Sequence, residues 1–236
     1  MAVKSQVIVC FGDSVTQGAP YVPVQDCFPV VLERRLNHYL QRFDTAVSVV
    51  NSGVAGENSA EGLARFDAAV AMHKPSLVTV EFGLNDLRPE PAKLIEPDQF
   101  AQNLQEIYDR CRGLDAQVIL MTPNPVINRL HGSWGTSLYD SYGGCNGAVS
   151  AYAEVVRQVA RETGAVLCDI YTRCIEVAIE KQFVGECYDY EDLVCLSTHI
   201  SETDGVHPTI TGQYLIAGEL YRDILLHEFL DCAEDL

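Results

Sequence analysis

A serine near the start of the chain and a histidine near its end are the residues best suited to catalysis. Ser14 lies in residues 11–18, FGDSVTQG, directly after a short apolar run. A serine hydroxyl is a weak nucleophile until a neighbouring base takes its proton. The segment alone fits two interpretations equally well: a catalytic serine, or a plain turn in which Asp13 and Ser14 bind nearby backbone amides.

The base that fits best is His207, in residues 204–208, DGVHP, just before the last predicted helix. The histidines at positions 38, 73 and 227 lie in or at the end of helical patterns instead. An aspartate three residues before a histidine can fold back and accept a hydrogen bond from Nδ1, which leaves Nε2 free to take a proton. The alternative is that Asp204 only caps the entry to a helix.

Two further segments could stabilise the oxyanion that forms when a serine attacks a carbonyl group. Residues 51–58, NSGVAGEN, and residues 82–86, FGLND, each follow an apolar run. A glycine amide in the first segment, the Asn85 carboxamide in the second and the amide of Ser14 would supply three donors. One such donor is typically worth about 3–4 kcal/mol in the transition state. Glycine and asparagine are also common in plain turns, so each segment alone is weak evidence.

Apolar periodicity predicts alternating strands and helices that would position these segments. The predicted strands are 7–11, 46–50, 77–82, 118–121 and 166–170, and the predicted helices are 28–40, 58–72, 97–112, 147–163 and 210–229. Asn58 and Glu61 have the spacing of a capping box at the start of the second helix.

Strands separated by helices indicate a parallel sheet covered on both faces. We predict an α/β fold, a flavodoxin-like three-layer α/β/α sandwich with a five-stranded parallel sheet, formed as one domain by residues 1–236. Open α/β sheets bind ligands at the carboxyl ends of their strands, so the segments above should converge there. Two long loops, at about 123–146 and 183–203, should lie near the same edge and have a functional role.

Taken together and in this order, the four segments resemble the SGNH (GDSL-like) hydrolase family. The matching blocks are GDSV at 12–15, NSGVAG at 51–56, GLND at 83–86 and DGVHP at 204–208. The resemblance covers nearly the whole chain and implies that Ser14 is the nucleophile of a triad completed by Asp204 and His207.

The resemblance also implies an oxyanion hole formed by Ser14, Gly56 and Asn85. Gly56 fits better than Gly53 because the glycine of the family usually precedes an acidic or polar pair that opens a helix, as residues 57–58 do. The chain departs from the family pattern at two positions: Val15 replaces the leucine of the name motif, and Leu84 stands where a small residue is commoner. Leu84 could narrow the site beside the oxyanion hole.

The family resemblance implies a serine ester hydrolase that works through an acyl-enzyme and needs no cofactor. We expect short-chain, acetyl-like esters as substrates, esters of carbohydrates among them. Residues that could contact substrate are Asp13, Trp134, Tyr139 and Tyr142. The alternatives are an O-acyltransferase with the same triad and a lysophospholipase or thioesterase. A non-enzymatic flavodoxin-like binder would leave the Asp204 and His207 pair unexplained.

Charge and cysteine content narrow the class of partner. The chain has 16 basic and 33 acidic side chains and a net charge of -17, so nucleic acid and anionic membranes would be repelled. No apolar stretch approaches the roughly 18 residues of a membrane span, and no signal peptide is visible. Nine irregularly spaced cysteines, among them Cys10 and Cys168 in apolar runs, indicate small buried hydrophobes in a reducing compartment. We therefore expect a cytoplasmic protein that binds a small-molecule ester and no metal; its oligomeric state is not predicted.

Overall fold

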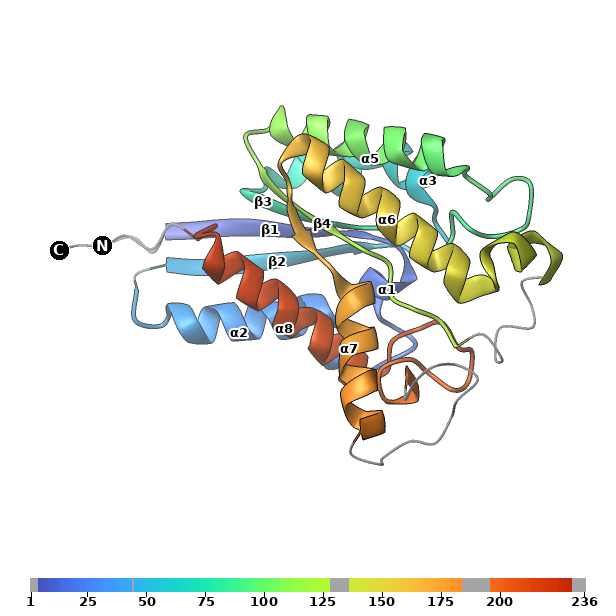
Figure 1. The fold of residues 1–236 in the computed structure, drawn as a ribbon. Helices are drawn as coiled ribbons and strands as arrows, with labels where there is room; N and C mark the ends of the chain where they lie inside the picture. Colours follow the sequence, from blue (N-terminus) through green and yellow to red (C-terminus); the bar gives the residue numbers. More distant parts are fainter. Residues whose placement is uncertain (1–3, 44, 128–135, 184–195, 231–236) are drawn as a thin grey trace.

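The computed structural model describes residues 4–43, 45–127, 136–183 and 196–230. Its strands form a single parallel sheet in the order β2-β1-β3-β4-β5 (Figure 1). The strands are β1 (Lys4–Gly12), β2 (Thr45–Gly53), β3 (Leu77–Glu81), β4 (Gln117–Met121) and β5 (Val166–Cys168). The predicted α/β fold with a five-stranded parallel sheet is confirmed.

Helices cover both faces of this sheet (Figure 1). On one face α2 (Phe28–Leu40) packs against α8 (Ile210–Leu226). On the other face α5 (Pro97–Arg112) packs between α3 (Ser59–Ala64) and α6 (Cys145–Thr163). The fold is therefore the three-layer sandwich that the alternating pattern predicted.

The apolar stripe predicted for α5 is the face that this helix buries. Phe100, Leu104, Ile107 and Cys111 are each at most 1 % exposed. They recur at intervals of three and four residues, which places them in one line along the helix. The bounds of α2 and α5 coincide with the predicted ones, because in both cases the periodic pattern begins beside a proline that fits the first turn of a helix.

The predicted helix 58–72 is wrong in its second half. The capping box of Asn58 and Glu61 is present, but α3 ends at Ala64 and is followed by a separate short helix, α4 (Phe66–Ala69), and a 3₁₀ turn. The break lies at Arg65, whose guanidinium donates hydrogen bonds to the backbone oxygens of Gly12 and Ser52. These hydrogen bonds tie Arg65 to the ends of β1 and β2, and at this point the chain departs from the path of a continuous helix.

The predicted strand 166–170 is too long, and the helix that follows it was not predicted. β5 ends at Cys168, and α7 (Ile170–Phe183) begins two residues later. Asp169 lies between them and accepts a hydrogen bond from the backbone N–H of Thr172, 3.0 Å away. Asp169 therefore acts as the N-cap of α7, a role for which aspartate is well suited.

Strand register brings the ends of the strands level with one another. Gly12 at the end of β1 pairs with Gly53 of β2 and with Glu81 of β3, and Glu81 pairs with Met121 of β4. The segments that follow these four strands therefore leave the sheet at one edge, as predicted from the parallel arrangement.

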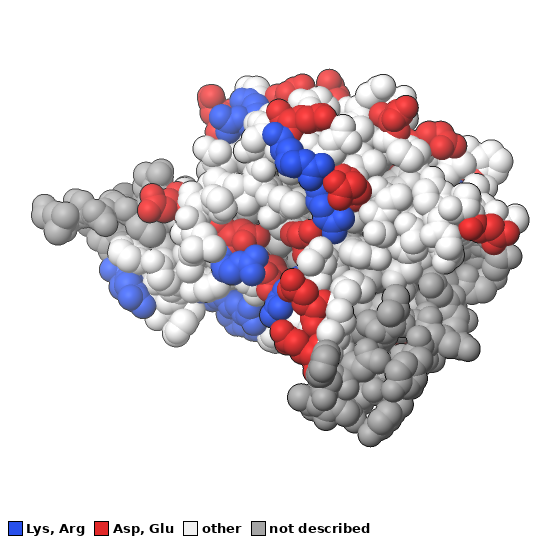
Figure 2. Space-filling model, viewed as in Figure 1, with Lys and Arg blue, Asp and Glu red and all other residues white. Residues whose placement is uncertain are grey.

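The burial of the cysteines agrees with the apolar runs in which several of them lie. The described cysteines are free and buried, including Cys10 and Cys168, which have no exposed surface. On the face seen in Figure 2, basic side chains lie among acidic ones. Ion pairs between described residues include that of Arg157 with Asp169 at 2.8 Å. Within the described part of the chain, no helix is long and apolar enough to span a membrane.

Candidate active site

Ser14 is the first residue of a four-residue helix, α1 (Ser14–Gln17), directly after β1. The turn is tight: a Cβ on Gly12 would lie 2.2 Å from Oγ1 of Thr16 and 2.5 Å from the backbone oxygen of Glu81. Asp13 caps the helix by accepting a hydrogen bond from the N–H of Val15 at 2.8 Å. The sequence therefore needs glycine at position 12 to present the next serine at the sheet edge.

His207 lies beside Ser14 although 193 residues separate them in the chain. Nε2 of His207 is 3.0 Å from Oγ of Ser14, and Nδ1 is 2.9 Å from Oδ2 of Asp204. The other carboxylate oxygen of Asp204 accepts the backbone N–H groups of Val206 at 2.8 Å and His207 at 3.0 Å. The DGVHP segment therefore folds back on itself in the way its spacing suggested.

Electrostatics favour an ionised Asp204. Partial burial alone would raise the pKa of this carboxyl, but the hydrogen bonds from Val206, from the backbone of His207 and from its ring outweigh burial and lower the pKa below its usual value. A carboxylate that accepts from Nδ1 selects the tautomer with its proton on Nδ1. Nε2 is then the free acceptor that faces the hydroxyl of Ser14.

Two loops support the turn that carries His207. Residues 199–209 form a narrow hairpin, in which Ser201 N–H donates to the backbone oxygen of His207 at 2.8 Å. The segment after β4 adds two bonds: Asn124 Nδ2 donates to the oxygen of Val206 at 2.9 Å, and Ile127 N–H donates to that of Gly205 at 2.8 Å. Residues 124–127 of the first predicted long loop and 199–203 of the second thus lie beside the histidine turn and hold it.

Asn85 and Gly56 lie on the loops that follow β3 and β2. The carboxamide of Asn85 donates one N–H to Oδ2 of Asp13 at 2.9 Å, which fixes the plane of the amide and leaves its second N–H for another acceptor. Gly56 has φ +81°, with open space where a Cβ would lie, and its carbonyl accepts from Nζ of Lys93 at 2.9 Å.

Gly53, the rival of Gly56, has a packing role instead. A Cβ at Gly53 would lie 2.2 Å from the backbone nitrogen of Gln17 and 2.7 Å from the oxygen of Asp13. Glycine at this position lets α1 approach the end of β2. This difference in surroundings supports the preference for Gly56 as the oxyanion-hole glycine.

Two predicted substrate contacts are buried elsewhere. Asp13 has no exposed surface, and its two carboxylate oxygens accept from the N–H of Val15 and from Asn85, so it holds the Asn85 loop in place and offers no free oxygen to a substrate. Tyr139 is 4 % exposed and its hydroxyl donates to the backbone oxygen of Leu87 at 2.7 Å. Both predictions need correction, because neither side chain presents a free polar group to the open edge.

The remaining predicted contacts have different outcomes. Tyr142, at the end of the 3₁₀ helix Thr136–Tyr142, is exposed and remains a predicted contact. Trp134 lies outside the described residues. Leu84 is 2 % exposed and belongs to the core, so it does not narrow the open site.

Tyr21 is a site residue that the sequence analysis missed. Its ring stacks on the imidazole of His207. Tyr21 lies in the loop after α1, where no helical or strand pattern could indicate this contact. Among the described residues, no three His, Cys, Asp or Glu side chains are grouped so that they could hold a metal ion.

Comparison with known proteins decides the family. Residues 10–215 match the model of the GDSL-like Lipase/Acylhydrolase family. The chain belongs to this family. Esterase TesA of Pseudomonas aeruginosa is 30 % identical to this GDSL hydrolase over 209 residues, covering 89 % of this chain and 83 % of the relative.

A second relative is similar in sequence, and a solved structure is similar in fold. Thioesterase 1/protease 1/lysophospholipase L1 of Escherichia coli K12 is 24 % identical over 223 residues, covering 94 % of this GDSL hydrolase and 85 % of the relative. The crystal structure of an acetyl xylan esterase, AlAXEase, shares the fold with a TM-score of 0.68 at 17 % identity, covering 92 % of this chain and 99 % of that one. This GDSL hydrolase is therefore a carboxylic ester hydrolase, and the non-enzymatic alternative is excluded.

Proposed function

We propose that this GDSL hydrolase cleaves short-chain, acetyl-like esters by a Ser14–His207–Asp204 triad through an acyl-enzyme. The observation that carries the proposal is the unbroken contact from Ser14 to Asp204 through the two ring nitrogens of His207, at 3.0 Å and 2.9 Å. This is the geometry in which a base can take the hydroxyl proton while a carboxylate stabilises the imidazolium that results.

In the first half-reaction, Nε2 of His207 takes the proton of Ser14 as Oγ attacks the ester carbonyl carbon. The carbonyl oxygen becomes an oxyanion that accepts from the N–H groups of Ser14 and Gly56 and from Nδ2 of Asn85. His207 then gives its proton to the leaving alcohol, and the C–O bond to that alcohol breaks. Water attacks the acyl-enzyme by the same steps and releases the acid.

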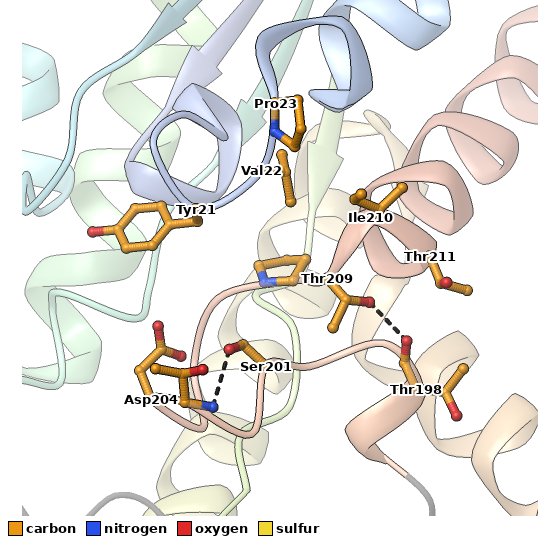
Figure 3. A pocket seen from close by; sticks show the side chains of 11 residues that line it. Tyr21, Val22, Pro23, Thr198, Ser201, Asp204, Thr209, Ile210 and Thr211 are labelled. Carbon is orange, nitrogen blue, oxygen red and sulfur yellow. Dashed lines mark hydrogen bonds between the residues drawn. The ribbon is translucent and has the colours of Figure 1, made fainter.

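A cavity lined by several hydroxyl side chains supports a carbohydrate as the alcohol part of the substrate. The cavity has a volume of about 510 Å³ and lies between residues 21–23 and the start of α8 (Figure 3). Tyr21 and Asp204, which both contact His207, form its border on the side of the triad. Five hydroxyl side chains line it: Thr198, Ser201, Thr203, Thr209 and Thr211. Hydroxyls donate and accept alike, as a polyol ligand requires, and the solved neighbour named above is an acetyl xylan esterase.

The nucleophile is tested by labelling with a fluorophosphonate and locating the adduct by mass spectrometry. We expect the adduct on Ser14, and we expect Ser14→Ala to lose both labelling and hydrolysis of p-nitrophenyl acetate with its melting temperature retained. The matched control is Ser48→Ala, since Ser48 lies exposed on β2 away from the site. Hydrolysis by Ser14→Ala at the wild-type rate would exclude Ser14 as the nucleophile.

Substrate class is tested by comparing acetylated sugars with a series of acyl esters from acetyl to dodecanoyl. We expect acetyl esters to have the highest kcat/KM, and Thr211→Trp to raise KM for an acetylated sugar more than for p-nitrophenyl acetate. A preference for decanoyl or longer chains would favour a lysophospholipase or thioesterase instead. Acyl transfer to an added sugar in place of water would identify an O-acyltransferase.

A further inference from the structure

Three buried carboxyl groups lie at the ends of β1 and β3, close to Asn85. Asp13, Glu81 and Asp86 are each at most 2 % exposed. Within the described part of the chain, none of the three forms an ion pair with a lysine, arginine or histidine. A buried carboxylate without a cation must either accept several hydrogen bonds or keep its proton.

Asp86 meets the first condition. Its Oδ1 accepts the backbone N–H of Ser59 at 3.0 Å and the hydroxyl of Ser59 at 2.5 Å. The hydroxyl of Ser59 in turn accepts from Nδ2 of Asn103 at 2.8 Å. Burial still raises the pKa of Asp86, to about 6, but these donors allow the carboxylate to exist at neutral pH.

Asp13 and Glu81 differ in the number of donors they receive. Asp13 accepts from two N–H groups, those of Val15 and Asn85. Among the described residues, Glu81 accepts a single hydrogen bond, from the hydroxyl of Thr16 to Oε2 at 3.2 Å. Its other oxygen, Oε1, is buried and faces no N–H or O–H donor among the described residues.

Asp13 and Glu81 lie at neighbouring strand ends, because Gly12, which precedes Asp13, pairs with Glu81 in the sheet. Their carboxyl groups are close enough there to influence each other electrostatically. Two ionised carboxylates this close would repel each other. A single proton shared between them makes one carboxyl the hydrogen-bond donor and the other its acceptor. That proton belongs on Glu81, because Asp13 already has two N–H donors that favour its charged form. A protonated Glu81 also turns its otherwise unpaired oxygen into a donor.

We propose that Glu81 keeps its carboxyl proton and donates it to Asp13, so that one shared proton fixes the Asp13 carboxylate and, through it, the Asn85 carboxamide in the oxyanion hole. Glu81 is therefore a positioning residue that acts through Asp13 and does not touch substrate. The inference rests on the role proposed above for Asn85.

The electrostatic surroundings of the two carboxyl groups support a proton on Glu81. Burial raises the pKa of Glu81 well above its usual range, and the charge of Asp13 adds to the effect. Burial also raises the pKa of Asp13, to about 7, against the hydrogen bonds that it receives. The other charged and titratable groups facing the pair are Asp86, Tyr21 and Arg65, which contacts Gly12 through its backbone oxygen and is itself paired with Glu57.

Loss of the shared proton at alkaline pH would place two adjacent negative charges behind the oxyanion hole. The pair would separate, the hold on Asn85 would weaken, and added negative charge would disfavour an oxyanion nearby. We therefore expect kcat to fall on the alkaline side for a reason that involves neither Ser14 nor His207.

The test compares Glu81→Gln with Glu81→Leu. Glutamine keeps a donor toward Asp13 but cannot titrate, so this variant should be the more active of the two and should lose the alkaline decline. Leucine has no donor, so its kcat should fall by about 10-fold to 100-fold with little change in KM, part of the effect of removing an oxyanion donor. The matched control is Thr79→Val, a buried polar change in the same strand, which should leave the pH profile unchanged.

The result that overturns the proposal is an alkaline decline in Glu81→Gln identical to that of the wild type. Should Glu81→Leu fail to fold, infrared and ¹³C NMR spectra of the wild type and Glu81→Gln at neutral pH still decide the question. The wild type should give a protonated-carboxyl signal that Glu81→Gln lacks, and an ionised Glu81 in the wild type would refute the shared proton. Failure of Ser14 labelling would instead count against the proposed function itself.

Discussion

The ring of Tyr21 lies flat against the imidazole of His207, with 3.4 Å between ring centroids and 11° between ring planes. Asp204 fixes the same imidazole in its own plane through Nδ1. Contact with a ring face and a hydrogen bond at the ring edge together restrict both tilt and rotation of His207. The face of an aromatic ring also attracts a cation, which would favour the imidazolium of the proposed acylation step.

The stacking predicts that Tyr21→Ala lowers kcat by about twofold to fivefold, because a cation–π contact at an exposed site contributes about 0.5–1 kcal/mol. Tyr21→Phe keeps the ring and should stay near the wild type. Steady-state kinetics with p-nitrophenyl acetate measures both. Equal losses in the two variants would show that the hydroxyl of Tyr21 matters and its ring does not.

The charge of Asp204 can be separated from its structural role. Asp204→Asn keeps an oxygen to accept the backbone N–H groups of Val206 and His207, so the turn should persist. It loses the carboxylate that selects the His207 tautomer, and kcat should fall by about 10³-fold to 10⁴-fold. Kinetics and a thermal melt test this, with Glu202→Gln as the control, because Glu202 is an exposed neighbouring carboxylate outside the cavity. Activity of Asp204→Asn within tenfold of the wild type would remove Asp204 from the proposed triad.

Substitution by alanine should mainly lower stability at Gly53 and mainly lower activity at Gly56. Gly53→Ala places a Cβ 2.2 Å from the backbone nitrogen of Gln17, so we expect lower stability in urea unfolding. Gly56→Ala meets open space and costs mainly the strain of φ +81°, about 1–2 kcal/mol, while it displaces the proposed oxyanion donor. Its kcat should therefore fall more than its stability. If Gly56→Ala were fully active, the glycine of the oxyanion hole would have to lie elsewhere.

The buried carboxyl groups make the free energy of unfolding depend on pH. Burial raises the pKa of Asp86 from 3.8 to about 6 and the pKa of Glu81 well above its usual value, so the folded state binds more protons than the unfolded state between the unfolded and the folded pKa of each group. Their contribution is fully present below the unfolded pKa and is lost as pH rises through the folded pKa. Urea titrations from mildly acidic to mildly alkaline pH should show falling stability, less steeply in Asp86→Asn. A rise over the same range would contradict the assignment.

The sequence suffices to predict that Ser14, Asn85 and His207 lie at one edge of the sheet, because each follows or precedes an element that apolar periodicity marks. Ser14 follows β1 and Asn85 follows β3, and parallel strands bring such ends to one edge. The helix α7 was missed although its signal was present, since Asp169 and Thr172 have the spacing of an N-cap bond inside an apolar stretch.

Glu81 and Tyr21 could not be placed from sequence for a different reason. Glu81 is the last residue of an apolar strand. The role proposed for its buried carboxyl depends on Asp13, which follows a different strand. Tyr21 lies in a loop without periodicity, and its partner His207 comes from the far end of the chain. Both depend on contacts between segments whose mutual distance the local pattern does not encode.

The separation of 193 positions between Ser14 and His207 also sets an order of events during synthesis. A ribosome adds Ser14 long before His207. A fragment cut before position 207 lacks the base that we propose for the Ser14 hydroxyl. Under the proposed mechanism, hydrolytic activity therefore reports that translation has passed the DGVHP turn and that this turn has reached Ser14.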